Sequence, residues 1–547
     1  MEYTGRMDLI KELRAAVRGE VEDSKETLLR CSRDWSLFQV IPKVVVFPKD
    51  ERDIESLVSF ATQNHIPLTC RSGGSDMTGG PLSDSVVLDM QKYFRDIQDI
   101  GKDFAIVQPG VWYRDFEKET LKHNLILPSY PASRDLCTIG GIVANNSGGE
   151  ESLAYGKTDK YVQELRVVLA DGKTHVIRPL SKEELEAKKN EEGFEGDMYR
   201  KMSVLLEENR EAILGAKPKV SKNSSGYALW DVWNGETFDL TKLFVGSQGT
   251  LGVITQARLR LIEPKKHSAL LVMFVNDTNL LARIIEKIGM RAPQSFECYD
   301  DRALRLALRF LGDFLRILKL SNMVSLAWRF LPEFIMFLFK GLPKLVLLAE
   351  FTDDSFLGAR KKAQEALRAL ADLPISCRVT KSQQEQEKYF AIRRASFKLL
   401  HEHPQGKSAA AFIDDIVVKP KDLPQFLPRL QSILEPYEND IIYTITGHVG
   451  DANFHIIPLI DLKHPEAKMI IMELMEKVHH LVFEFGGSMS AEHNDGLLRT
   501  PFVPEMFGEK VYQLFVKVKD IFDPLRIFNP GKKVEGDFKF AFHHITP

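Results

Sequence analysis

The chain has 547 residues, and its 73 lysines and arginines against 76 aspartates and glutamates give a formal net charge of −3. Apolar residues make up 44% and charged residues 27%, a globular composition that excludes a disordered or collagen-like chain. Such a chain lacks the overall positive charge suited to nucleic acid, so we expect no nucleic-acid partner. At roughly 150 residues per domain, two to four domains are expected.

The cysteines lie far apart, with no CxxC or CxxxC spacing: Cys31, Cys70, Cys137, Cys298 and Cys377. This spacing excludes a disulfide scaffold and argues against cysteine-ligated iron–sulfur clusters and zinc ribbons. The first residues carry charges every few positions and show no apolar core of a secretory signal. The sequence has no uninterrupted run of about 18 apolar residues, so we expect no membrane-spanning helix. We therefore expect a cytoplasmic protein.

The first part of the chain combines a polar segment with an alternating pattern. Residues 1–40 are expected to be helical, with one helix from residue 8 to about residue 33. After it, β-branched runs alternate with helical spacing. The pattern predicts a helix at 50–65 and strands at 44–47, 66–70, 85–90, 104–111, 164–172 and 252–262. This alternation favours an α/β unit.

A second α/β unit is expected after residue 264, with strands at 270–275 and 345–351 and helices at 279–289 and 359–372. Between its halves, residues 302–344 hold eight basic and two acidic residues, a net charge of +6, interleaved with large apolar side chains. One interpretation is a pair of helices that completes this unit. The other is a surface that docks on anionic lipid, where each lysine or arginine contributes about 1 kcal/mol.

Three glycine-rich loops lie beside strands of the first unit: RSGGSDMTGGP (71–81), LPSYPASRDLCTIGGIVANNSGG (127–149) with YGKT (155–158) after it, and GSQGTLGVIT (246–255). Such loops offer backbone N–H groups and hydroxyls without steric bulk, as a pyrophosphate cradle needs. A strand follows the first loop, which excludes a Rossmann fingerprint. The second is expected to be an uninterrupted loop that wraps a ligand. Together the loops indicate a large phosphorylated cofactor in extended form.

The order of these motifs, with KNSSGY (222–227) before the third, resembles the FAD-binding domain of the vanillyl-alcohol-oxidase/PCMH flavoproteins. Over about residues 40–535 the chain is similar to FAD-linked D-2-hydroxyacid dehydrogenases of the D-lactate, D-2-hydroxyglutarate and glycolate-oxidase types. The resemblance implies an α+β fold with a two-subdomain PCMH-type domain and an α/β cap domain whose sheet is mainly antiparallel. The implied divisions are an N-terminal helical segment (1–40), the FAD-binding domain (41–264), the cap or substrate domain with the basic apolar insertion 302–344 (265–490), and a C-terminal segment that returns to the flavin (491–547).

The resemblance also implies how FAD is held. Ser75 stands where covalently linked relatives often have histidine, so non-covalent FAD is expected. The pyrophosphate is expected on residues 71–80, with residues 128–149 along the flavin. The residues assigned to the cofactor in this way are Arg71, Ser72, Gly73, Gly74, Ser75, Asp76, Thr78, Gly79, Pro131, Ser133, Thr138, Gly140, Gly141, Asn145, Gly148, Gly149, Tyr155, Gly252, Ile254 and Asn529. Gln248 replaces a glutamate that many relatives have.

Two further motifs carry candidate metal ligands. ITGHVGDANFHIIP (445–458) places His448 and His455 on either side of a Gly-Asp turn flanked by strand-like runs, and SAEHNDG adds Glu492 and His493. Two histidines and a carboxylate can bind a divalent metal, most easily Zn²⁺ and also Mn²⁺ or Fe²⁺, although a histidine pair at this spacing is often structural. Resemblance to the GHxGDGNxH and EHG motifs implies that His448, His455 and Glu492 bind metal and that His493 is the active-site base. Two glycines of these motifs are replaced, by Ala452 and Asn494.

The segment YFAIRRASFKLL (389–400) is helix-like. The resemblance implies that Arg393 binds the substrate carboxylate, a task that suits a planar guanidinium, whereas Arg394 fits a solvated arginine. Ile413 and Ile457 stand where relatives acting on hydroxyglutarate or other acids tend to have polar residues. These two positions argue against recognition of a second carboxylate.

The reaction implied by the resemblance is oxidation of a D-2-hydroxyacid, D-lactate-like or D-2-hydroxyglutarate-like, by metal-assisted hydride transfer from C2 to flavin. Electrons would pass to a quinone, a cytochrome or another carrier. If that carrier is in a membrane, the protein would sit peripherally on its inner face through residues 302–344. Two alternatives remain open: an oxidase that uses O₂, and a flavin-binding accessory subunit of an electron-transfer complex.

Overall fold

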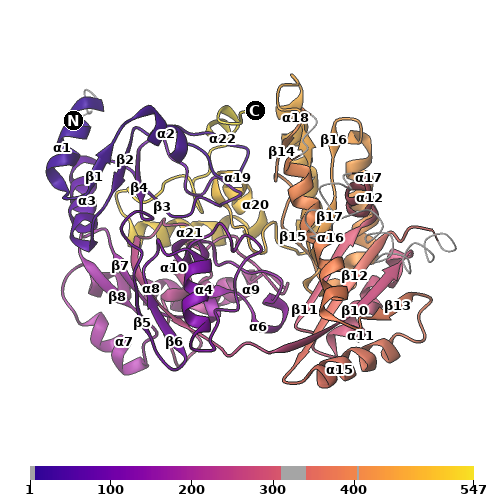
Figure 1. The fold of residues 1–547 in the computed structure, drawn as a ribbon. Coiled ribbons are helices and arrows are strands. Elements are labelled where there is room, and N and C mark those ends of the chain that lie inside the picture. Colours follow the sequence, from indigo (N-terminus) through magenta and orange to yellow (C-terminus); the bar gives the residue numbers. More distant parts are fainter. Residues whose placement is uncertain (1–5, 310–340, 403–405) are drawn as a thin grey trace.

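The computed structural model of the chain describes residues 6–309, 341–402 and 406–547. Figure 1 shows two bodies side by side, with the C-terminal helices (yellow) returning to the body built from the N-terminal half (indigo to magenta). The cap lies in the other body (pink to orange). None of the described helices has both the length and the apolar character needed to cross a membrane.

The first subdomain is built on a four-stranded sheet of order β1-β2-β4-β3, in which β4 pairs in parallel with both β2 and β3. Its strands are β1 (Glu20–Glu22), β2 (Val44–Phe47), β3 (Leu68–Arg71) and β4 (Val86–Asp89). Helix α3 (Glu51–Asn64) connects β2 to β3 and buries Ile54, Leu57 and Val58 against the sheet. The strands and the helix predicted here are confirmed, and the first glycine-rich loop leaves directly from the end of β3.

The single helix predicted over residues 8–33 is wrong. This segment forms α1 (Arg6–Ala16), β1 and α2 (Lys25–Cys31). At Gly19 a Cβ would lie 2.1 Å from the carbonyl oxygen of Phe47, so only glycine lets β1 come close enough to pair with β2. The Asp53 carboxylate accepts hydrogen bonds from the backbone N–H groups of residues 18 and 19, both at 2.9 Å. The N-terminal segment is therefore part of the first sheet.

The second subdomain is a five-stranded antiparallel sheet of order β5-β6-β9-β7-β8. Its strands are β5 (Ile97–Ile100), β6 (Phe104–Val107), β7 (Val162–Val168), β8 (Thr174–Ile177) and β9 (Val253–Arg260). The predicted strands 104–111, 164–172 and 252–262 are confirmed with small shifts of their ends. The helices of this body are α4 (Tyr113–Leu121), α5 (Ile139–Asn145), α6 (Ser152–Tyr155), α7 (Lys182–Lys189), α8 (Phe194–Glu208), α9 (Arg210–Ala216), α10 (Thr241–Phe244), α19 (Gly496–Arg499), α20 (Val503–Phe507), α21 (Glu509–Phe522) and α22 (Phe538–His543).

Residues 127–149 are not the uninterrupted loop that was predicted, because they contain helix α5. Its buried residues Ile139, Ile142 and Val143 follow helical spacing and pack into the main core. The second and third residues of the helix are glycines, which obscured this spacing. A Cβ at Gly140 would lie 2.6 Å from the Pro109 side chain, so the close approach of α5 requires glycine there.

The cap is a seven-stranded sheet of order β13-β10-β12-β11-β17-β18-β15, antiparallel throughout its pairings, as predicted. Its strands are β10 (His267–Val275), β11 (Ser295–Asp300), β12 (Leu345–Asp353), β13 (Ser376–Val379), β15 (Ile416–Val417), β17 (Ile445–His448) and β18 (Asn453–Ile456), beside a small sheet of β14 (Ser408–Ala409), β16 (Ile441–Ile442) and β19 (Leu459–Ile460). The cap helices are α11 (Leu281–Gly289), α12 (Asp301–Arg309), α15 (Phe356–Ala369), α16 (Gln383–Glu402), α17 (Leu423–Leu434) and α18 (Ala467–Glu484).

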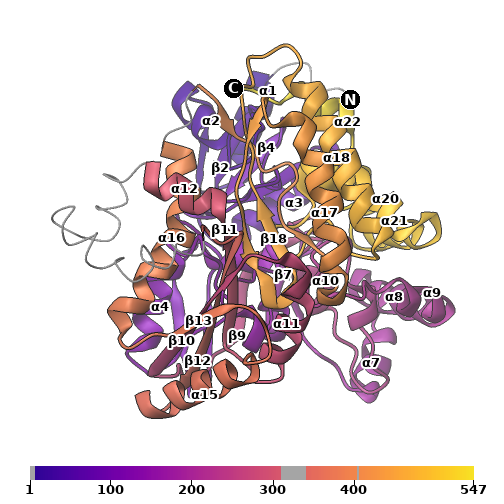
Figure 2. The same cartoon turned by 90° about the vertical axis from the view of Figure 1, so that its right-hand side faces the viewer.

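Helices cover both faces of this sheet (Figure 2). Leu270, Val272 and Phe274 of β10 pack with α12 and α16, whereas the intervening residues Leu271 and Met273 join the core with α11 and α15. Because successive side chains of a strand point to opposite faces, a strand buried on both faces becomes a continuous apolar run. The predicted strands at 270–275 and 345–351 and the helices at 279–289 and 359–372 are confirmed.

The basic segment 302–344 is only partly described. Its first part is α12, where Arg302 pairs with Glu438 and its guanidinium lies 4.1 Å from the centre of the Tyr443 ring. These contacts are those of a helix that completes the cap. Residues 310–340 lie outside the described residues, and with them most of the segment expected to contact lipid.

Candidate active site

A cavity of about 680 Å³ lies where the glycine-rich loops meet the cap. Of the residues expected to bind the cofactor, those that line it are Arg71, Ser72, Gly73, Gly74, Ser75, Asp76, Pro131, Ser133, Gly140, Gly141, Asn145, Gly148, Gly252 and Ile254. From the cap and the C-terminal segment it is lined by Arg393, Arg394, Thr446, His448, His455, Ile457, Glu492 and His493. Residues separated by several hundred positions thus share one cavity.

Some residues expected at the cofactor are not among those that line this cavity: Thr78, Gly79, Thr138, Gly149, Tyr155 and Asn529. The Thr138 hydroxyl accepts a hydrogen bond from the Gly73 N–H at 3.1 Å. The Asn529 amide donates to the carbonyl oxygens of Gly80 and Gln248, at 2.9 and 2.7 Å. These two side chains hold the loops to one another.

Asp76 lines the cavity but shapes its own loop. Its carboxylate accepts hydrogen bonds from the backbone N–H groups of Thr78 and Gly80, at 2.9 and 2.8 Å, and from the Asn145 amide at 3.0 Å. Gln248 joins the third loop to the C-terminal segment, because its amide oxygen accepts the Gly496 N–H at 2.8 Å. The glutamine found in place of glutamate therefore keeps a structural hydrogen bond.

The first loop has the chemistry needed for an anionic pyrophosphate. The Arg71 guanidinium donates through Nη2 to the Arg33 carbonyl oxygen at 2.8 Å, whereas its buried Nη1 has no hydrogen-bond partner among the described residues. At Gly74, which has a φ of 67°, a Cβ would lie 2.2 Å from Arg71 Nη2. A buried unpaired guanidinium N–H group is costly unless a ligand satisfies it. The residues present therefore fit FAD in this cavity.

The predicted histidine hairpin is confirmed. Strands β17 and β18 pair antiparallel, with His448 opposite Asn453 and Thr446 opposite His455. The centres of the His448 and His455 rings lie 5.2 Å apart. Ala452 ends the turn with a φ of 52°, in the left-handed region that favours glycine.

Glu492 completes a set of possible metal ligands. One ligand atom each from His448, His455 and Glu492 lie within 4.8 Å of one another. On the far side of each ring, His448 Nδ1 lies 2.8 Å from a Glu297 oxygen and His455 Nδ1 lies 3.3 Å from an Asp414 oxygen. Carboxylate partners at Nδ1 orient a histidine so that Nε2 can bind a cation. The donor set fits Zn²⁺, Mn²⁺ or Fe²⁺.

Lys222 holds the other oxygen of Glu492. Its Nζ lies 2.6 Å from Glu492 Oε1 and 3.0 Å from Asp451, while Glu492 Oε2 lies 3.3 Å from His448 Nε2. Burial raises the pKa of Glu492, but Lys222 and His448 lower it well below its usual range, so the carboxylate stays ionised. Lys222 was not identified as a site residue from the sequence, where it appears only as the first residue of KNSSGY.

His493 lies beside two aspartates. Its Nδ1 is 2.7 Å from Asp414, and the backbone N–H groups of Glu492 and His493 donate to Asp415 at 2.8 and 2.7 Å. Burial lowers the pKa of His493, but Asp415 and Asp414 raise it to about 9. The ring stacks on His455 with centres 5.0 Å apart. This arrangement stabilises the imidazolium that forms when His493 takes up a proton.

Arg393 lies in the cavity, as expected, but already contacts two carboxylates. Its Nη1 lies 3.1 Å from Glu150, and its Nη2 pairs with Glu297, the carboxylate that also holds His448. Arg394 is not simply solvated. It lines the cavity and pairs with Glu150 at 2.9 Å. Neither glutamate was identified from the sequence.

Models of two known domain families match two separate parts of the chain. Residues 42–178 match the model of an FAD binding domain, and residues 264–533 match the model described as FAD linked oxidases, C-terminal domain. The chain therefore contains an FAD binding domain and the C-terminal domain of the FAD-linked oxidases. The match to an FAD binding domain confirms that the expected cofactor is FAD.

Several curated proteins are similar to this chain. It is 25% identical to the D-2-hydroxyglutarate dehydrogenase of Pseudomonas putida over 94% of this chain, and it spans about half the length of that relative. It is also 25% identical to the D-lactate dehydrogenase of Archaeoglobus fulgidus, over 90% of this chain and 91% of the relative. The Bacillus subtilis glycolate oxidase subunit GlcD is again 25% identical, over 91% and 90%.

Solved structures share the fold. The 4-ethylphenol oxidase of Gulosibacter chungangensis superposes with a TM-score of 0.69 at 16% identity, over 98% of each chain. p-Cresol methylhydroxylase gives a TM-score of 0.67 at 14% identity, over 97% of each chain. At these identities the likeness concerns the fold alone, and it confirms the PCMH-type α+β architecture.

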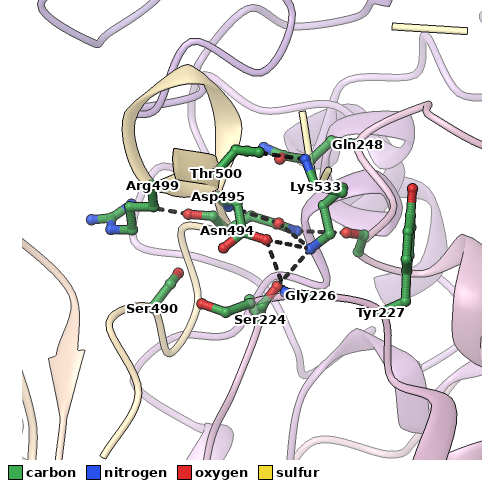
Figure 3. Close-up of polar contacts among 12 residues, drawn as sticks. Ser224, Gly226, Tyr227, Gln248, Ser490, Asn494, Asp495, Arg499, Thr500 and Lys533 are labelled. Atoms are coloured by element: carbon green, nitrogen blue, oxygen red, sulfur yellow. Dashed lines mark hydrogen bonds and ion pairs between the residues drawn. The ribbon is translucent and has the colours of Figure 1, made fainter. Parts of the chain in front are cut away.

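A buried lysine ties the His493 segment to the FAD-binding domain (Figure 3). Lys533 Nζ donates to the Ser224 carbonyl oxygen at 2.9 Å and to the Asn494 side-chain oxygen at 2.7 Å, and it pairs with Asp495 at 2.9 Å. Asn494 has a φ of 71°, which asparagine tolerates better than most residues. The replacement of glycine at 494 therefore preserves the turn and adds an anchor for the residue beside His493.

Lys533→Met is expected to destabilise the protein by about 3–5 kcal/mol, because it leaves Asp495 buried without its cation. Denaturant unfolding followed by intrinsic fluorescence measures this loss. The matched control is Lys477→Met, which removes an exposed pair with Glu473 and should cost under about 1 kcal/mol. Equal effects of the two substitutions would contradict the anchoring role.

Proposed function

We propose that this chain is an FAD-dependent dehydrogenase that oxidises a D-2-hydroxyacid to the corresponding 2-oxoacid. The observation that supports this best is that one cavity joins the glycine-rich loops to His493 and Arg393. Relatives named for D-2-hydroxyglutarate, D-lactate and glycolate share the 2-hydroxyacid group. FAD is non-covalent in this proposal, since Ser75 offers no histidine for attachment. A divalent metal is held by His448, His455 and Glu492.

Each polar side chain has a role in the proposed reaction. Arg393 binds the substrate carboxylate and gives up its single contact with Glu150. His493 takes the proton of the 2-hydroxyl at Nε2, while Nδ1 stays beside Asp414. A divalent cation, when bound, supplies positive charge that lowers the pKa of the hydroxyl and of His493. FAD, when bound, accepts the hydride from C2.

The balance of this reaction requires a second acceptor. Two electrons leave the substrate with the C2 hydride and one proton goes to His493, so the C–OH group becomes a carbonyl. The electrons then pass to a quinone, a cytochrome or another carrier. Contact with a membrane carrier through residues 302–344 is part of the proposal.

Product formation tests the proposal. Purified protein with an artificial electron-accepting dye should convert a D-2-hydroxyacid, and not its L enantiomer, to an equal amount of 2-oxoacid and reduced dye. Absence of 2-oxoacid with every acid of a D panel would contradict it. Hydrogen peroxide formed in equal amount, without dye, would place the protein among the oxidases that use O₂.

A further inference from the structure

Glu150 projects from the end of the second glycine-rich loop toward two arginines of α16. Its Oε1 lies 3.1 Å from Arg393 Nη1 and 3.2 Å from Arg394 Nε, and its Oε2 lies 2.9 Å from Arg394 Nη2. The contact with Arg394 is therefore bidentate, and the contact with Arg393 is single. Burial raises the pKa of Glu150, but Arg393 and Arg394 lower it to about 2, so the carboxylate is ionised at working pH.

This difference between one contact with Arg393 and two with Arg394 determines where a substrate carboxylate binds more easily. A substrate carboxylate on Arg393 competes with one hydrogen bond of Glu150, whereas a carboxylate on Arg394 competes with two. Arg393 remains paired with Glu297 through its other terminal nitrogen. One substrate carboxylate is therefore accepted more readily at Arg393 than at Arg394.

Among the described residues that line the cavity on the cap side, a second substrate carboxylate finds no comparable partner. Among the described cavity-lining residues of the cap, the positively charged side chains apart from the histidines are Arg393 and Arg394. Thr446 and Ile457, which also line the cavity there, are uncharged. A distal carboxylate near Arg394 would approach the ionised Glu150, and like charges in a partly buried site repel.

We propose that Glu150 is a specificity-determining residue that makes the cavity select 2-hydroxy monocarboxylates over 2-hydroxy dicarboxylates. This inference rests on the proposed function. It predicts that Glu150→Gln releases Arg394 to bind a second carboxylate, because a neutral amide pairs more weakly with a guanidinium and does not repel an anion.

Anaerobic stopped-flow reduction of the flavin by D-lactate and by D-2-hydroxyglutarate tests it in the FAD-loaded protein. For the unaltered protein, the ratio of apparent second-order rate constants should favour D-lactate at least about tenfold. Glu150→Gln should cut this ratio about tenfold or more, mainly through tighter binding of the dicarboxylate. The factor corresponds to about 1.4 kcal/mol, close to the lower end of the range for one hydrogen bond to a charged group.

Two further variants test whether the change in substrate preference depends on the contact between Glu150 and Arg394. Glu151→Gln is the matched control, because Glu151 bonds to Tyr130 and Gln294 rather than to an arginine, and an amide oxygen can accept both hydrogen bonds. Its ratio should equal that of the unaltered protein. Adding Arg394→Met to Glu150→Gln should restore the original ratio, since the second carboxylate then loses its partner.

The outcomes separate this inference from the proposed function. An unchanged ratio in Glu150→Gln, or a preference of the unaltered protein for D-2-hydroxyglutarate, overturns the role of Glu150 while flavin reduction still supports the dehydrogenase. No flavin reduction by any acid overturns the proposed function. In that case the dissociation constants of pyruvate and 2-oxoglutarate, read from the flavin spectrum of both proteins, still decide whether Glu150 discriminates.

Discussion

Replacing His493 by alanine is expected to leave FAD bound and to slow flavin reduction by substrate about 10²–10⁴-fold, the usual contribution of a general base. His493 lines the cavity, and Asp414 and Asp415 favour its protonated form. Without this imidazole, the proton of the 2-hydroxyl loses the acceptor that the proposed reaction assigns to it. Anaerobic stopped-flow spectroscopy at saturating substrate measures the loss directly.

The control for this variant is His480→Ala, since the His480 side chain is 67% exposed on a cap helix. It should reduce flavin at the unaltered rate. Asp414→Asn should also slow reduction while retaining FAD, because it removes the carboxylate that orients Nδ1 of His493. Full activity of His493→Ala would remove this histidine from the reaction.

Removal of a divalent metal is the second change with a large expected effect. Dialysis against a chelator should remove one ion per chain, leave the visible flavin spectrum in place and slow flavin reduction about 100-fold or more. The physical reason is that a metal ion provides several kcal/mol of charge stabilisation to an oxygen that loses its proton. Metal analysis and stopped-flow reduction on the same sample measure both quantities, and added Zn²⁺ or Mn²⁺ should restore the rate.

Substitution of one proposed metal ligand distinguishes loss of the metal from other effects of the chelator. His448→Ala should bind the ion more weakly and lose activity that added metal restores only in part, because His448 belongs to the compact set with His455 and Glu492. His464→Ala, at an exposed histidine, should behave as the unaltered protein. Turnover that survives complete removal of metal would exclude the ion from the reaction.

Local sequence patterns predicted those parts of the site that are formed by residues close together in the sequence. The Gly-Asp turn between two strand-like runs predicted the hairpin of His448 and His455, because a two-stranded pairing follows from a turn and its flanks. The long apolar runs predicted the central cap strands β10 and β12, which are buried on both faces.

Contacts between distant segments could not be predicted in this way. Glu297 is 151 positions from His448, and Glu150 is 243 positions from Arg393. No period or motif connects such residues, because tertiary packing alone brings β11 and α16 to the flavin loops. The same reason explains the errors at residues 8–33 and 127–149, where close approach at Gly19 and Gly140 overrides the local pattern.

The central claim is that this cavity holds an FAD that a D-2-hydroxyacid reduces. The visible absorption spectrum of the purified protein, before and after anaerobic addition of a panel of D-2-hydroxyacids, tests it most directly. We expect a flavin band that acid precipitation releases into solution and that at least one D-2-hydroxyacid bleaches. A flavin band that no acid bleaches would contradict the proposed reaction, and absence of flavin even after reconstitution with FAD would contradict the assignment of the cavity.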